Sequence, residues 1–367
     1  MRRRDESEGS SIQVSSDLLE WLWDSAACPI LDELGFRETP ARTPTHKWPR
    51  IWWIPTGLMS RLPLHAAGRH YATSSETVLD RVVSSYSPSI KALIYARRNT
   101  MQKDLSHASK TTLLVSMRTT PQHPDPKVPK PGDLRFAEEE IQILGNLLSS
   151  STSKAKKLEE PCKGDVLGSI DTCTIFHFAG HGISDPLDPS KSCLLLNDWV
   201  GNPLTVEDLT ELKLYRKSPW LAYLSACSTG ESQAENLQDE AMHLVSACQL
   251  AGFPHVVGSL WKVDDECSAD AAREVYEAVR DKGWSNEAVA LGVHNAARFL
   301  RRKTGGGGWR AGPGDVLTDV DGDNERGEVA APVYGKGGGS GQNRGLGYAR
   351  REEGNPSIWP AYIHVGP

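Results

Sequence analysis

The stretch TCTIFHFAGHG at residues 172–182 decides the fold of this chain, together with WLAYLSACSTG at residues 220–230. Each stretch opens with residues typical of a buried strand and then gives way to small residues and glycine, which indicates a turn. Along the flanking sequence, strand patterns alternate with helical ones. This alternation predicts a layered α/β domain with a mostly parallel central sheet.

His181 and Cys227 follow the two predicted strands. In a parallel α/β sheet, the carboxyl ends of neighbouring strands form the site crevice. A histidine and a cysteine there would face each other, as a thiol nucleophile and its base require. Gly180 and Gly182 would allow a tight turn that exposes the imidazole. We therefore predict that Cys227 is a nucleophile and His181 its general base and acid.

A plainer reading exists for each member of this pair. A cysteine at a buried strand end is usually an inert, small apolar residue. A histidine in a turn often does no more than hydrogen-bond its own loop. Two matching strand ends with complementary side chains favour the catalytic interpretation. His177, four residues before His181, is expected to pack against the sheet as a structural residue.

The composition excludes several classes of function. The net charge is −6 and the pI about 6.0, with no clustered basic face, which argues against a nucleic-acid partner. No segment approaches the ~20 apolar residues of a membrane span, and the first residues lack the apolar run of a signal peptide. We expect neither a membrane association nor a cofactor.

The seven cysteines are odd in number, widely spaced and free of CxxC pairs, which argues against a disulfide framework. Reduced thiols in the cytoplasm fit this pattern better. Cys173, His177 and His181 lack a second close pair of ligands, so no metal site is expected.

Helical periodicity marks several flanking segments. Ser15 would cap a helix through about Leu34, which Cys28-Pro29 would interrupt. Residues 134–148 form an amphipathic pattern, and the three glutamates within it are expected to point outward: Glu138, Glu139 and Glu140.

The chain divides by composition into five parts. A glycine-rich stretch with few apolar residues separates the last predicted strand from the rest, and we expect it to be a disordered insertion. The parts are a disordered lead at 1–15, an N-terminal part at 16–110, a catalytic part at 111–303, the insertion at 304–355 and a C-terminal strand returning to the sheet at 356–367.

The sequence resembles the CHAT domain family in its fungal form. The motifs that carry the resemblance are FHFAGHG (176–182), LSACSTG (224–230), DEAMHLVSACQLAGFPHVVGSLWKVDD (239–265) and WPRIWWIPTGLMSRLPLHAAG (48–68). The resemblance implies a caspase-like three-layer α/β/α sandwich with a His–Cys dyad, shared distantly with caspases, separases and gingipains. The tetratricopeptide array that often precedes such domains does not occur in this sequence, and the glycine-rich insertion departs from the family.

The resemblance also implies further site residues. An oxyanion hole would be formed by the backbone N–H groups of Gly182 and Cys227. Separases carry a similar aspartate after a similar strand, which implies an acidic substrate pocket with Asp264 and Asp265, and cleavage after Arg or Lys. Asp239, just after the nucleophile loop, would add negative charge to this pocket. Alternatively, Asp264 or Asp265 caps the helix that begins there, and Asp239 is a first-turn acid favoured by the helix dipole.

Two classes of function remain open. The first is a regulated cysteine endopeptidase that works through a thioester acyl-enzyme on a protein or peptide substrate and has an activating protein partner, in a signalling or cell-death-like pathway. The alternative is a catalytically silent caspase-like adaptor, or a fragment of a larger signalling protein with tetratricopeptide repeats.

Overall fold

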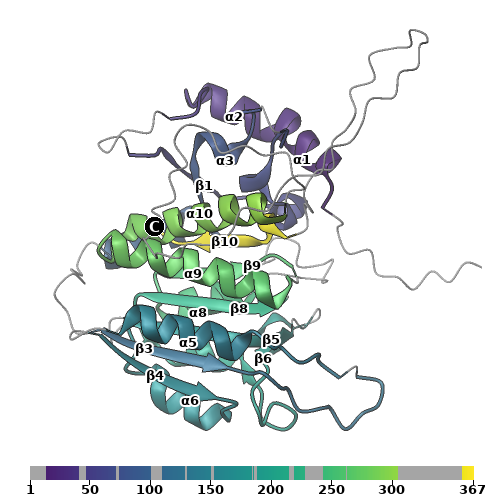
Figure 1. Cartoon of the computed structure of the whole chain (residues 1–367), viewed down its shortest axis with the longest axis vertical. Helices are drawn as coiled ribbons and strands as arrows, with labels where there is room; N and C mark the ends of the chain where they lie inside the picture. The colour runs from purple at the N-terminus through teal and green to yellow at the C-terminus, as the bar shows by residue number, and fades with distance from the viewer. Residues whose placement is uncertain are drawn as a thin grey trace, which may run out of the picture.

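The structure is a computed structural model of the chain, and Figure 1 shows its arrangement. It describes residues 14–40, 47–71, 74–100, 110–128, 130–149, 153–183, 185, 188–214, 219–227, 243–261, 263–304 and 358–367. Residues 1–13 of the predicted lead (1–15) and residues 305–355 of the predicted insertion (304–355) lie outside the described residues, as do residues 356 and 357.

A twisted central sheet organises the described chain, with the strand order β1-β2-β10-β9-β8-β5-β3-β4. The pairs β1–β2, β2–β10, β9–β8, β8–β5, β5–β3 and β3–β4 are parallel, and β10 runs antiparallel to β9. The short strands β6 and β7 extend from β5 as an antiparallel flap. The strands are β1 (Arg50–Trp53), β2 (Val83–Tyr86), β3 (Lys110–Ser116), β4 (Ser153–Glu159), β5 (Ile175–Ile183), β6 (Cys193–Leu194), β7 (Leu204–Thr205), β8 (Leu221–Cys227), β9 (His255–Ser259) and β10 (Tyr362–Val365).

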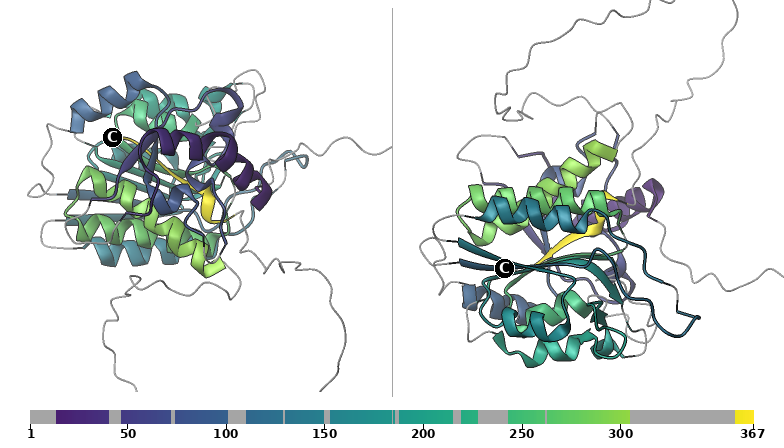
Figure 2. Two further views of the ribbon diagram at one scale, coloured as in Figure 1. Left: turned by 90° about the horizontal axis from the view of Figure 1, so that it is seen from above. Right: turned by 60° about the horizontal axis from the view of Figure 1, so that its bottom comes forward.

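Helices cover both faces of the sheet, which gives the three layers expected from the sequence (Figure 2). One face carries α5, α9 and α10, and the other carries α6 and α8. The α-helices are α1 (Ser16–Leu22), α2 (Cys28–Glu33), α3 (Val78–Arg81), α4 (Ile90–Thr100), α5 (Ala137–Leu148), α6 (Lys163–Ile170), α7 (Val206–Glu211), α8 (His243–Ala251), α9 (Asp265–Asp281) and α10 (Asn286–Thr304).

The side chains of the central strands alternate between two apolar cores, as the period of two in a strand requires. On β5, Phe176 and Phe178 pack into the core with α6 and α8, whereas Ile175 and Ala179 pack into the core with α5 and α9. Tyr223 on β8 joins the second core. The odd-numbered positions of β5 and of β8 therefore lie on the same face of the sheet, the face that α5 and α9 cover.

The N-terminal helix differs from the expectation. Ser15 caps it as predicted, since its side chain accepts the Leu18 N–H at 3.2 Å. The chain then stays helical to Glu33, with a π-helical turn at Trp23–Ala27, and Cys28-Pro29 does not interrupt it. Pro29 has no N–H to donate to the preceding turn, and the π-helical turn at Trp23–Ala27 lies directly before it.

The turn predicted at residues 180–182 was also wrong, whereas residues 228–230 of the turn predicted after the second strand lie outside the described residues. Strand β5 continues through Ile183 and β8 through Cys227, so His181 lies within extended backbone. Gly180 is required by packing instead, because a Cβ there would lie 2.5 Å from the Phe178 ring. The sequence interpretation also missed β4 and α6.

Candidate active site

His181 and Cys227 are paired in the sheet. The parallel ladder of β5 and β8 runs in register from Ile175 opposite Leu221 to His181 opposite Cys227. Two residues 46 positions apart in sequence thus occupy neighbouring backbone positions at the carboxyl ends of adjacent strands. The Cys227 side chain and residues 228–242, including Asp239, lie outside the described part of the chain.

A backbone carbonyl orients the His181 ring. The half-buried imidazole has its Nε2 at 2.7 Å from the carbonyl oxygen of Gly132, in the loop before α5. A carbonyl oxygen only accepts hydrogen bonds, so Nε2 carries the proton. In the neutral ring Nδ1 is then the basic nitrogen. A contact between residues far apart in sequence therefore fixes the tautomer.

The remaining cysteines are poor candidates for a nucleophile. All six that the structure describes are free thiols, and four of them are buried. Burial raises the pKa of Cys173 and of Cys248 to about 12 and that of Cys193 to about 11. Because the thiolate is the reactive form, these three thiols are inert at neutral pH.

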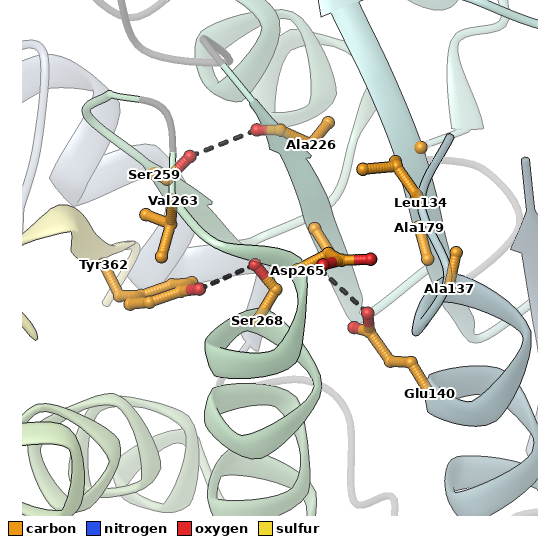
Figure 3. Close-up of a pocket in the computed structure, with 12 residues that line it drawn as sticks. Leu134, Ala137, Glu140, Ala179, Ala226, Ser259, Val263, Asp265, Ser268 and Tyr362 are labelled. Atoms are coloured by element: carbon orange, nitrogen blue, oxygen red, sulfur yellow. Dashed lines mark hydrogen bonds between the residues drawn. The ribbon is translucent and has the colours of Figure 1, made fainter. Parts of the chain in front are cut away.

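A small pocket adjoins the paired positions on the α5–α9 face of the sheet (Figure 3). Ala179 and Ser225 contribute to its wall, are paired in the ladder, and precede His181 and Cys227 by two residues. The cavity encloses about 20 Å³, room for about one water molecule. Its lining is Leu134, Ala137, Glu140, Ala179, Gly180, Ser225, Ala226, Ser259, Val263, Asp265, Ser268 and Tyr362.

Glu140 is the acid on the buried side of this pocket. Its side chain is 3% exposed, although the sequence interpretation pointed it outward. One carboxylate oxygen, Oε2, accepts the hydroxyl of Ser225 at 3.1 Å. The other, Oε1, lies 3.0 Å from Nε2 of His177, an ion-pair distance, without an aligned hydrogen bond among the described residues.

His177 is fully buried, and it packs against the sheet as expected from the sequence. Its Nδ1 lies 3.3 Å from the hydroxyl of Tyr276, and its ring stacks on Tyr223 with the centroids 4.8 Å apart. Burial raises the pKa of both tyrosines well above the ordinary value, so both phenols stay protonated. His177 therefore links β5, β8 and α9 below the pocket.

Asp264 and Asp265 occupy different environments. Asp264 is exposed and caps α9, its Oδ1 accepting the Glu266 N–H at 3.1 Å. Asp265 is half-buried and lines the pocket, where its Oδ2 accepts the Phe136 N–H at 3.0 Å. The structure thus brings Asp265, and not Asp264, to the pocket.

Sequence reasoning missed Glu140, Ser225 and Tyr362 in the pocket and Gly132 at the histidine. A signal for Glu140 was present, because it lies three residues after Ala137 and four before Leu144, on the apolar stripe of its helix. Tyr362 could not be found this way, because its strand enters the sheet from a distant part of the sequence.

The parallel sheet with helices on both faces, together with a histidine paired with a cysteine at its carboxyl edge, defines the class: a cysteine peptidase-like α/β fold. The pattern of one family matches residues 16–367, and the chain belongs to the CHAT domain family.

Solved structures with a similar arrangement are distant in sequence. The separase in the Saccharomyces cerevisiae separase–securin complex is 12% identical, with a TM-score of 0.45 over 83% of this chain and 14% of that chain. The Arg-specific cysteine proteinase gingipain R is 10% identical, with a TM-score of 0.43 over 79% of this chain and 64% of that chain. No curated protein matches the chain.

The described residues contain no helix that is long and apolar enough to cross a membrane. They also contain no group of three or more metal-ligating side chains suited to an ion.

Proposed function

We propose that this chain is a cysteine endopeptidase with Cys227 as nucleophile and His181 as general base and acid. The observation that carries the proposal is the register that sets the backbone of His181 directly opposite that of Cys227. Positions paired in a parallel ladder lie on one face of a sheet. The hydrogen bond from His181 Nε2 to Gly132 supports the same assignment, because it leaves Nδ1 as the base.

The reaction would proceed in two steps. The Cys227 thiolate attacks the carbonyl carbon of the scissile peptide bond, and the C–N bond breaks as the leaving amine takes a proton from the His181 imidazolium. The product is a thioester between Cys227 and the acyl half of the substrate. His181 then removes a proton from water, whose oxygen attacks the thioester carbonyl and restores the thiol.

Gly182 is a suitable donor for the oxyanion. The Leu195 N–H donates to the His181 carbonyl at 2.9 Å, so Gly182 and Leu194 form the non-hydrogen-bonded pair of the β5–β6 ladder. In such a pair the N–H points away from the partner strand. We propose that the Gly182 N–H and the backbone N–H of Cys227 bind the developing negative charge.

We propose further that the enzyme cleaves after Arg or Lys. Asp265 supports this specificity, because it places a carboxylate in the pocket below the paired positions. Asp264 is better explained as a helix cap. Asp239 lies outside the described residues, and we retain the proposal from the sequence that it adds negative charge to the pocket. A protein substrate, an activating protein partner and a cytoplasmic location likewise remain predictions from the sequence.

A covalent probe tests the nucleophile. A peptide with an electrophilic ketone after arginine should label the wild-type protein at a single cysteine, and mass spectrometry of the digest should place the label on Cys227. We expect Cys227→Ala to abolish labelling and His181→Ala to slow it by about 10²-fold or more, the usual size of a general-base contribution.

Cys28→Ala is the matched control, because it removes a half-buried thiol on α2, which lies away from β5 and β8 (Figure 1). It should label at the wild-type rate. Labelling that survives Cys227→Ala would reject the proposed nucleophile. A correctly folded wild type that resists the probe and cleaves no peptide would favour the silent adaptor.

A further inference from the structure

Glu140 carries a feature that the proposed dyad does not use. It is a carboxylate nine-tenths or more buried, it lines the pocket, and its Oε1 has no aligned hydrogen bond among the described residues. Burying an ionised carboxylate is costly unless a counter-charge and hydrogen bonds compensate it. The described group at ion-pair distance is His177, which is itself fully buried.

The charge of the pocket lining is one-sided. Among the described residues that line the pocket, two are acids, Glu140 and Asp265, and none is lysine or arginine. Asp265 already accepts the Phe136 N–H from the loop before α5. A positively charged group entering the pocket would give Glu140 the counter-charge that its buried surroundings supply only through His177.

The position of Glu140 relates it to the proposed nucleophile. Its Oε2 accepts the Ser225 hydroxyl at 3.1 Å, and Ser225 precedes Cys227 by two residues on the same face of β8. The side chain of a substrate residue immediately before the scissile bond branches one atom from the carbonyl carbon under attack. The pocket begins at Ala179 and Ser225, two residues before His181 and Cys227, and is therefore within reach of this substrate side chain.

We propose that Glu140 is a specificity-determining residue that receives the positive end of a lysine or arginine side chain at this substrate position. The inference rests on the proposed peptidase function and adds a second acid, on another helix, to the one expected from the sequence. The cavity of about 20 Å³ holds about one water molecule, so an entering side chain displaces that water and spreads the lining. The attraction between the buried Glu140 carboxylate and the positive end of the substrate side chain offsets the free-energy cost of this displacement.

A purely structural role makes a different prediction. Glu140 also ties α5 to β5 and β8 through His177 and Ser225. If that were its whole contribution, neutralising it would slow the cleavage of every substrate by the same factor, irrespective of substrate charge.

The experiment compares two peptides that differ in one group. One carries arginine before the scissile bond, and the other carries citrulline, which has nearly the same shape without the charge. kcat/KM is measured for both peptides with the wild type, Glu140→Gln and Glu139→Gln, normalised to active sites titrated with the covalent probe. Glu139→Gln is the matched control, since it removes the same charge from the exposed neighbouring position.

We expect Glu140→Gln to lower the ratio of kcat/KM for arginine over citrulline by about tenfold or more, the usual worth of a charged hydrogen bond. Cleavage of the citrulline peptide should change less than threefold per titrated site, and Glu139→Gln should keep the wild-type ratio. An equal loss on both peptides would overturn the assignment of Glu140 and leave the peptidase proposal intact.

A second variant covers the case in which Glu140→Gln does not fold. Glu140→Asp keeps the charge and withdraws it by one methylene, so it should shift the preference from lysine toward the longer arginine. An unchanged arginine-to-lysine ratio would refute the role of Glu140. A wild type that cleaves the citrulline peptide as well as the arginine peptide would instead refute the basic-residue specificity itself.

Discussion

Two buried histidine clusters lie in the central sheet, and they differ in which of their polar groups lack a hydrogen-bond partner. The pocket cluster, His177 with Glu140, joins an imidazole to a carboxylate below the pocket. The junction cluster lies where β10 inserts between β2 and β9, and it consists of Ser85, His364, His255 and Asn286. Both clusters are buried, but only the pocket cluster contains an acidic group.

The junction cluster forms a chain of hydrogen bonds with one direction. Asn286 Oδ1 accepts from His255 Nε2 at 2.9 Å, so His255 Nδ1 must accept from His364 Nε2 at 3.0 Å. His364 Nδ1 then accepts from the Ser85 hydroxyl at 2.8 Å, and Arg50 donates to the Ser85 oxygen at 3.0 Å. Every ring nitrogen in this chain has a partner when both imidazoles are neutral.

The comparison shows that burial of a histidine does not by itself indicate function. The junction cluster is complete within the protein, and a further proton would break one of its bonds beside the positive charge of Arg50. The pocket cluster holds a carboxylate whose second oxygen lacks an aligned donor, and it adjoins a cavity. Unsatisfied charge next to accessible space distinguishes a candidate binding group from a structural one.

The largest expected effect concerns the pocket cluster. His177→Ala removes the imidazole that lies 3.0 Å from the buried carboxyl group of Glu140, and leaving such a group without its partner costs about 3–5 kcal/mol of the free energy of unfolding. Urea denaturation at neutral pH measures this loss. His364→Ala, the matched change in the junction cluster, breaks neutral hydrogen bonds and should cost less, about 1–3 kcal/mol. Equal losses would contradict the distinction between the two clusters.

The junction cluster should make stability depend on pH. Burial is the main cause that lowers the pKa of His255, to about 4, and burial with the neighbouring His255 lowers that of His364 well below its ordinary value. Since the unfolded chain binds protons below about pH 6.5 and the native chain does not, stability should fall as the pH drops from 6.5 toward 4.

For His255 alone this loss amounts to about 2–3 kcal/mol between pH 7 and pH 4.5. Denaturation midpoints across that range measure it. His255→Asn should flatten this part of the profile, and an unchanged slope in that variant would show that other groups dominate the acid sensitivity.

The smallest expected effect separates the two neighbouring aspartates. Asp264→Ala removes the cap of α9 and should cost about 1 kcal/mol of stability, with the arginine-over-citrulline ratio unchanged. Asp265→Asn keeps the hydrogen-bond acceptor for Phe136 and should lower that ratio. If the two variants affected the ratio equally, the assignment of Asp264 to the cap alone would be incorrect.

Much of the central fold could be predicted from sequence, because its signals are local. The apolar runs around Phe176 and Leu221 predicted β5 and β8, although both strands extend beyond the first glycine or serine that was expected to end them. The pairing of His181 with Cys227 also agreed with the expectation that neighbouring strand tips meet. The glycines misled in one respect, since Gly180 accommodates the Phe178 ring within a continuing strand.

The pocket could be predicted only in part, because its lining comes from distant segments. Asp265 was foreseen from its place after β9, whereas Glu140 was assigned to solvent from its charge alone. Strand β4 was not predicted because its sequence, SKAKKLE, is mostly polar. The strand lies at the edge of the sheet, where water can hydrogen-bond its polar side chains and its unpaired backbone groups. Local patterns cannot reveal which distant element covers a given side chain.

The insertion of β10 has a consequence for how the chain is made. Among the described strands, β2 and β9 are joined through β10 alone, and β10 also brings Tyr362 to the pocket. A nascent polypeptide emerging from the ribosome can pair β3, β4, β5, β8 and β9 early, but it cannot close the sheet until residues 362–365 have been synthesised. The sheet and the wall of the pocket therefore stay incomplete until β10 has joined them, however early the other strands pair.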